Sequence, residues 1–91
     1  MAVRVRLAGT LKAIAAGKAE IPASAGRVRA IIGELDRAYA GLGSRVLGAD
    51  GALKKSVLVH LNGQDVRQLE GVETVVGESD ELLITIPLAG G

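Results

Sequence analysis

One segment of this sequence has the spacing of an amphipathic helix, and it is flanked by short segments that alternate between apolar and polar residues. The stripe that shares one helix face consists of Val28, Ile31, Ile32, Leu35 and Tyr39. We expect the helix within residues 24–43, with Ser24 as N-cap and Gly41 or Gly43 as its left-handed end. We interpret the internal Gly33, which costs about 1 kcal/mol relative to alanine, as a point where the helix backbone packs closely on a sheet.

The remaining regular segments have the period of two that is typical of half-buried strands. The expected strands are residues 3–7, 18–22 (ended by Pro22), 56–61, 64–69 and 81–87. Asn62-Gly63 predicts a two-residue hairpin turn, because both residues tolerate positive φ angles. Residues 8–17, 42–55 (with an Asp50-Gly51 turn) and 70–80 are expected to be connections.

One helix and four or five short strands can bury their apolar faces only as two layers. The core must be built from aliphatic side chains, because 10 Val, 6 Ile and 12 Leu stand beside a single aromatic residue, Tyr39. The sequence therefore predicts an α+β domain in which a mixed sheet of four to five strands wraps one main helix. We expect the domain to span residues 1–87, and residues 88–91 to form a flexible Gly-Gly tail.

The residues that most chemistry requires are absent or isolated in this sequence. Zero Cys excludes a disulfide framework, a thiolate metal site and a Cys nucleophile, and the single His60 has no second histidine with which to form a metal set. There is no phosphate-binding glycine motif, and no aromatic platform or basic stripe for nucleic acid. With no secretory signal and no apolar run of about 20 residues, we expect a cytoplasmic protein with no bound cofactor, metal, nucleic acid or membrane.

The C-terminal residues offer the one reactive group that remains. Pro87 would stop strand pairing, Leu88 offers an apolar contact, and Ala89, Gly90 and Gly91 narrow to bare backbone that a tight tunnel could admit. When extended, residues 87–91 span at most about 16–18 Å. An unactivated carboxylate is a poor electrophile, so a partner enzyme would have to adenylate Gly91 before a sulfur or amine nucleophile takes over the acyl group. The pattern favours a carrier over a catalyst.

Charge is distributed unevenly along the chain. Residues 1–63 carry ten Lys/Arg against four Asp/Glu, a net charge of +6, and residues 64–91 carry one Arg against six Asp/Glu, a net charge of −5. One interpretation is a solvated surface with scattered charges; the other is electrostatic steering of the acidic half toward a basic partner.

Three stretches of the sequence resemble the MoaD/ThiS family of ubiquitin-like sulfur carriers. They are Val59–Gly71 ("VHLNGQDVRQLEG"), Gly77–Leu82 ("GESDEL") and Pro87–Gly91 ("PLAGG"). The family has a V-N-G-x-D-V-R hairpin, a D-G-D-E turn and a P-x-A-G-G end in this order. This chain departs from it at Leu61, which precedes Asn62-Gly63, and within Glu78-Ser79-Asp80.

The resemblance implies a ubiquitin-like β-grasp fold with the first and last strands side by side. It also implies a reaction cycle, in which an enzyme resembling ubiquitin-activating enzymes uses ATP and Mg²⁺ to adenylate Gly91. A persulfide donor then converts the product to a thiocarboxylate, and a downstream enzyme accepts the sulfur. The chain looks most like carriers for cysteine or secondary-metabolite biosynthesis. The alternatives are the small subunit of molybdopterin synthase, a protein modifier conjugated through Gly91, and a binding module with an idle tail.

A partner would be expected to dock on the outer face of the sheet. The alternation places Leu58, His60, Leu83 and Thr85 away from the core. Two exposed leucines among polar residues indicate a docking patch, although single surface leucines are common.

Overall fold

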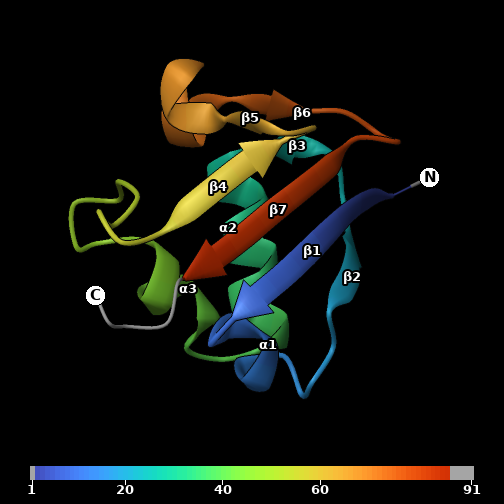
Figure 1. Cartoon of the computed structure of the whole chain (residues 1–91), viewed down its shortest axis with the longest axis vertical. Coiled ribbons are helices and arrows are strands. Elements are labelled where there is room, and N and C mark those ends of the chain that lie inside the picture. The colour runs from blue at the N-terminus through green and yellow to red at the C-terminus, as the bar shows by residue number, and fades with distance from the viewer. Residues whose placement is uncertain (1, 87–91) are drawn as a thin grey trace.

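A five-stranded sheet in the order β2-β1-β7-β4-β5 forms one layer of the molecule, and the helix α2 crosses its inner face (Figure 1). The computed structural model describes residues 2–86. The strands are β1 (Val3–Gly9), β2 (Glu20–Ala23), β4 (Leu58–Leu61), β5 (Gln64–Asp65) and β7 (Glu81–Ile86). β1 and β7 lie side by side and parallel, and the other pairs of this sheet are antiparallel. The predicted mixed sheet on one helix, with the first and last strands adjacent, is confirmed.

The alternating residues of the central strands form the sheet side of the core. Val5 pairs with Leu82, and Ile84 lies between Leu7 and Val59. All five side chains are buried, and full burial of each aliphatic side chain contributes about 1.5–3 kcal/mol. The strand predicted from residue 56 begins at Leu58, and the strand predicted to end at Pro22 continues through it to Ala23. Pro22 is tolerated there because β2 is an edge strand.

The predicted helix is α2 (Val28–Ala38), and its apolar stripe faces the sheet. Val28, Ile31, Ile32 and Leu35 are buried, and Tyr39, the residue after the helix, packs partly buried against the core. Gly41 has the predicted left-handed conformation, with a φ of +94°, but it is not the end of this helix, because α2 ends at Ala38 with Tyr39 as its C-cap and Gly41 precedes the next helical turn. The interpretation of Gly33 was wrong: the nearest atom to a Cβ there would be Nη1 of Arg37 at 3.9 Å, and no sheet atom approaches it.

The helix begins three residues later than Ser24 would require. Gly26–Arg27 form a short strand, β3, that pairs with β6 (Val75–Val76), and Arg27 is the N-cap without a side-chain cap. The Val28 amide donates to the carbonyl oxygen of Thr74 at 2.9 Å. Ser24 is not the N-cap because backbone from a distant segment supplies the acceptor that a capping side chain would otherwise provide.

Two predicted connections contain helical turns that sequence periodicity did not reveal. α1 (Leu11–Ile14) buries Leu11, and α3 (Leu42–Val46) buries Leu42 and Val46. A helix of four or five residues has too few turns to display a 3.6-residue period. The Asp50-Gly51 turn within 42–55 is confirmed, with Gly51 at a φ of +83°.

The segment from residue 64 to 76 is also more varied than the predicted strand and loop. Only Gln64–Asp65 remain a strand, and the chain continues as two 3₁₀ helices, η1 (Val66–Gln68) and η2 (Gly71–Glu73), before β6. The Asn62-Gly63 turn that precedes it is confirmed, because Asn62 and Gly63 have φ angles of +50° and +89°.

Candidate functional site

The C-terminal site predicted from the sequence comprises Pro87, Leu88, Ala89, Gly90 and Gly91, and all five lie outside the described residues. The predicted boundary between domain and tail lies outside them too. The structure does describe the end of β7 at Ile86, from which the chain continues into this site. The position of Ile86 relative to the sheet is therefore the structural information that bears on the predicted reactive terminus.

Gly9 fixes the end of β7 and was missed in the sequence analysis. It is the last residue of β1 and pairs with Ile86. Its φ is +70°, and a Cβ at this position would overlap with the carbonyl oxygen of Ile86. Only glycine satisfies both the left-handed conformation and the close backbone approach. The sequence signal was present, because a glycine directly after an alternating strand often marks such an approach, but it lay in a Gly/Ala-rich stretch assigned to a loop.

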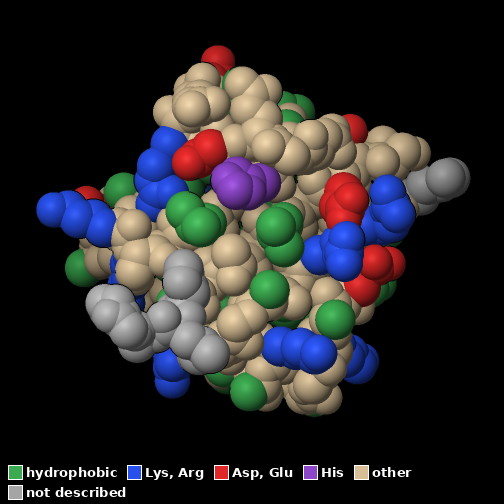
Figure 2. All heavy atoms as spheres, viewed as in Figure 1, with side chains coloured by type: hydrophobic (Ala, Val, Ile, Leu, Met, Phe, Trp, Pro, Cys, Tyr) green, Lys and Arg blue, Asp and Glu red, His purple; other side chains and the backbone are tan. Residues whose placement is uncertain are grey.

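The residues predicted to form a docking patch do come together on the outer face of the sheet. His60 of β4 pairs with Leu83 of β7, and Leu58 pairs with Thr85. Leu58 is 37% exposed, and the other three are partly buried. Figure 2 shows the only histidine of the sequence in purple between green hydrophobic side chains near the centre of this face. Neighbouring strands thus build a small mixed apolar surface around one imidazole.

Charged residues border this surface on two sides. Arg6 of β1 pairs with Leu83 on the neighbouring strand, and Asp65 of β5 pairs with His60. Arg6 also forms an ion pair with Glu81, with 3.0 Å between Nη1 and Oε2. An exposed pair of this kind contributes at most about 1 kcal/mol to stability. Its consequence is positional, because it orients a cation beside the apolar surface.

The opposite end of β7 is held by a polar network. Nδ2 of Asn62 donates to Oδ1 of Asp80 at 3.1 Å, and the Glu81 amide donates to Oδ1 of Asn62 at 2.9 Å. The Gly77 amide donates to Oδ2 of Asp80 at 2.8 Å. The bond from Asn62, and after it the bond from the Gly77 amide, lower the pKa of the Asp80 carboxyl from its ordinary value of 3.8. Two motifs that the family resemblance rested on are thus joined in space, and they form a structural turn.

The described residues also bear on metal binding and on membrane-spanning helices. Within residues 2–86, no group of three or more His, Cys, Asp and Glu side chains is placed to hold a metal ion. No helix in the same residues is long and apolar enough to span a membrane. What the arrangement offers is a mixed apolar surface on the sheet and a strand that leads toward residues 87–91.

The comparisons with known proteins agree with this architecture. A family model described as the ThiS family matches residues 5–91. The sulfur carrier protein CysO of Mycobacterium tuberculosis is 29% identical to this chain over 93 residues, which cover all of both proteins.

Two solved structures extend the similarity to three dimensions. A chain in the crystal structure of the Amycolatopsis orientalis BexX/CysO complex is 31% identical, with a TM-score of 0.89 over 99% of this chain and 100% of that chain. The solution structure of the small archaeal modifier protein 1 from Methanosarcina acetivorans is 34% identical, with a TM-score of 0.82 over 98% of this chain and 95% of that chain.

Proposed function

This chain belongs to the ThiS family, and from that membership we propose that it is a sulfur carrier whose reactive group is the carboxylate of Gly91. The β-grasp fold and the family resemblance stated from the sequence motifs are confirmed. The relative from Mycobacterium tuberculosis is named a sulfur carrier. On this proposal the chain is a carried co-substrate, and the catalysts are its partners.

The family match carries the proposal because it extends through the last residue. It covers residues 5–91 and so includes Pro87 and the Gly90-Gly91 pair. β7, held between β1 and β4, ends immediately before these residues. An extended segment of residues 87–91 reaches at most about 16–18 Å, far enough to enter a partner's active site while the folded domain remains outside.

The chemistry requires two steps at Gly91, an adenylyl transfer to the carboxylate and then an acyl transfer to sulfur. A carboxylate oxygen attacks the α-phosphorus of ATP and pyrophosphate leaves, which gives an acyl adenylate with a good leaving group. Hydrosulfide then attacks the carbonyl carbon and AMP leaves with one carboxylate oxygen, so that a thiocarboxylate remains. ATP and Mg²⁺ would be bound by the activating enzyme. A biosynthetic pathway to cysteine or another sulfur-containing metabolite would accept the sulfur.

We assign docking of the activating enzyme, and of the downstream acceptor, to the outer face around Leu58, His60 and Leu83. The supporting observations are the paired positions of these residues on adjacent strands and the exposure of Leu58. A related chain occurs in a two-protein complex with BexX. A face with an apolar centre and a charged rim has the composition of transient protein interfaces.

Intact mass spectrometry tests this function directly. The full chain is incubated with an activating enzyme of the family, ATP, Mg²⁺ and sulfide, and one oxygen-to-sulfur exchange is expected. Leu58→Ser should slow the exchange by raising the KM for the carrier, whereas Leu69→Ser should not. Leu69 is a matched control because it is the same residue type, 40% exposed against 37% for Leu58, and it follows η1 and is not part of a strand of the sheet. An unchanged mass with active enzyme would contradict the proposal.

Protein modification is the second candidate function. It is favoured by the similarity to small archaeal modifier protein 1, since conjugation would use the same activated Gly91. Conjugates of higher mass in a lysate supplied with activating enzyme and ATP would indicate a modifier. The names of the relatives described above do not favour the alternative of a molybdopterin synthase subunit.

A further inference from the structure

The solvent-facing side of α2 carries an arginine-lined groove that the proposed function does not use. Its lining consists of Arg27, Arg29, Ala30, Gly33 and Arg37. The helix lies behind the sheet in Figure 1, and its apolar stripe faces the core. The groove therefore points away from the outer face, and a partner could occupy it while the carrier is docked through the sheet.

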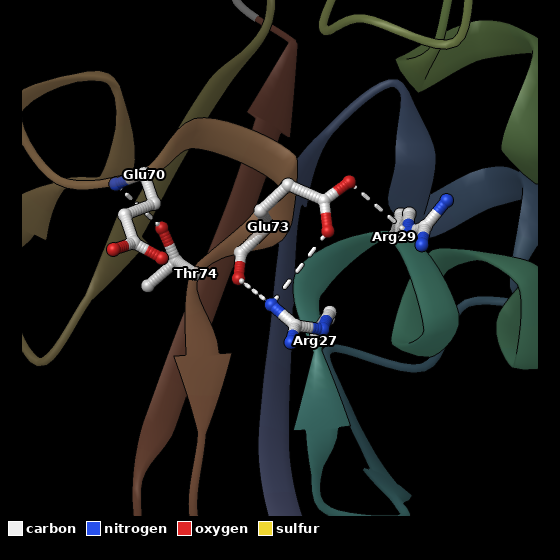
Figure 3. Close-up of polar contacts among 5 residues, drawn as sticks. All are labelled: Arg27, Arg29, Glu70, Glu73 and Thr74. Atoms are coloured by element: carbon white, nitrogen blue, oxygen red, sulfur yellow. Dashed lines mark hydrogen bonds and ion pairs between the residues drawn. The ribbon is translucent and has the colours of Figure 1, made fainter.

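The arginines at one end of this groove already hold a carboxylate. Glu73 forms ion pairs with both arginines: one carboxylate oxygen lies 3.2 Å from Nε of Arg29, and the other lies 3.7 Å from Nη1 of Arg27 (Figure 3). Nη1 of Arg27 also donates to the main-chain oxygen of Glu73 at 3.0 Å. The side chains of Arg27 and Arg29 are 51% and 61% exposed, and each guanidinium group has five N–H donors, so donors remain for a further acceptor.

The other end of the groove is open and cationic. Arg37 is exposed and has no ion pair with any residue in the range 2–86. Arg29, Gly33 and Arg37 follow one another at intervals of four residues, so they lie along one helix face. The two arginines are about 12 Å apart along the helix axis.

Gly33 forms the floor between the two arginines, and the fold does not explain its presence. A glycine inside a helix is unfavourable, and at this position a Cβ would meet no atom closer than 3.9 Å. Alanine would thus fit without strain. With Ala30 beside it, Gly33 keeps the floor of the groove free of side chains.

We propose that this groove binds an extended acidic segment of a partner protein, with two carboxylates four residues apart. Residues i and i+4 of an extended chain point to the same side and are about 13 Å apart, which matches the spacing of Arg29 and Arg37. A nucleic acid is less suited to the groove, because Glu73 lies among the arginines and no aromatic side chain is present in the lining for base stacking.

Fluorescence anisotropy with dye-labelled peptides tests the groove. The probe is a Thr/Ser/Val peptide with two glutamates four positions apart, and the comparison peptide has the same composition with adjacent glutamates. At low ionic strength the spaced peptide should bind more tightly, and its amide shift changes in ¹⁵N spectra should map to residues 27–37. Equal binding of both peptides, no binding, or tighter binding of an oligouridine probe would overturn the proposal.

Variants of the full chain make the test specific. R29Q/R37Q should weaken binding about tenfold, while K12Q/K18Q, which removes the same charge from exposed positions elsewhere, should change it little. E73Q should strengthen binding, because it removes the internal competitor. G33L should raise the melting temperature and yet weaken binding, a combination that partial unfolding cannot produce. An unchanged affinity in G33L or in R29Q/R37Q would contradict the assignment.

Discussion

The two ends of β7 are held in place by opposite means. At its start, Asn62 and Asp80 supply side-chain hydrogen bonds that join the hairpin turn to the 77–80 turn. At its end, Gly9 of β1 has no side chain, so its backbone can lie directly against the backbone of Ile86. One end is thus fixed by polar atoms, and the other by close packing of bare backbone.

The difference suits what each end has to do. The start of β7 has no role in the proposed reaction, so polar side chains can enclose it. The end of β7 leads into the segment that has to enter a partner's active site on our proposal. A backbone contact with Gly9 positions Ile86 without placing a bulky side chain beside the exit of the chain. The predictions that follow test whether stability and function separate along this strand.

Deleting Gly91 should have the largest effect on function and almost none on folding. Without it the terminal carboxylate belongs to Gly90 and falls about 3.5 Å short of its position in the activating enzyme. Sulfur transfer should fall below detection, because a misplacement of 1 Å can already cost about 100-fold in rate. Intact mass spectrometry of the oxygen-to-sulfur exchange measures the effect on function, and thermal melts measure the effect on folding. A Gly91-deleted chain that is still converted to the thiocarboxylate would contradict the tail argument.

Gly9→Ala should have the largest effect on stability. The left-handed conformation alone costs an alanine about 1–2 kcal/mol, and the overlap with the Ile86 carbonyl adds to that. Gly17→Ala is the matched control, since Gly17 has a φ of +82° and its Cβ would meet nothing within 4 Å. The difference between the two variants in the free energy of unfolding, measured by urea denaturation, gives the cost of the overlap with the Ile86 carbonyl. Equal losses would mean that the close approach to Ile86 does not constrain the end of β7.

Asn62 and Ser24 show how much of the fold could be predicted from the sequence. The sheet, the helix and the hairpin turn could be predicted because alternation, a helical stripe and Asn62-Gly63 are local signals that the tertiary structure obeys. The prediction of Ser24 as the N-cap was wrong because the carbonyl oxygen of Thr74 accepts from the amide of Val28 at the helix start. Thr74 lies 46 residues from Val28, so the sequence around the helix gives no sign of this bond.

The candidate site also contains features that the sequence predicted and features that it did not. The alternation of their strands predicted that Leu58, His60 and Leu83 lie on the outer face, whereas their adjacency comes from the pairing of β4 with β7, which the sequence analysis did not predict. Gly9 carries a local signal, as a glycine directly after an alternating strand, but its contact with Ile86 could not be predicted, because that contact depends on the register of two strands that are distant in sequence. The C-terminal residues, including Gly91, were identified from their chemistry and remain a prediction.

Asn62→Gly should reduce stability less than Gly9→Ala. Glycine keeps the positive φ of +50° while it removes the side-chain bonds to Glu81 and Asp80. The lost bond to the Glu81 amide is worth about 1 kcal/mol, and the lost bond to Asp80 adds to it. Asn62→Ala should be less stable than Asn62→Gly, because it also forces a Cβ into the left-handed region. Sulfur transfer at saturating partner should be unchanged in both, and a loss of transfer would show that the two ends of β7 are coupled.

Asp80→Asn should have the smallest effect, and one that depends on pH. The folded state lowers the pKa of Asp80 below its ordinary 3.8, so the carboxylate stabilises the fold fully above that value and loses its contribution as the pH falls through the folded pKa. Urea midpoints should therefore differ between wild type and variant by a constant amount above about pH 5 and converge in more acidic solution. Because Asn62 is the main cause of the shift, the convergence should be much weaker when both chains carry Asn62→Gly.

Gly9→Ala is the control for this pH dependence, and it should reduce the stability by the same amount at every pH, because the contact of Gly9 with Ile86 contains no ionisable group. A pH-dependent cost at Gly9, or a pH-independent one at Asp80, would mean that the polar and the backbone-packed ends of β7 are not held by the separate means described here.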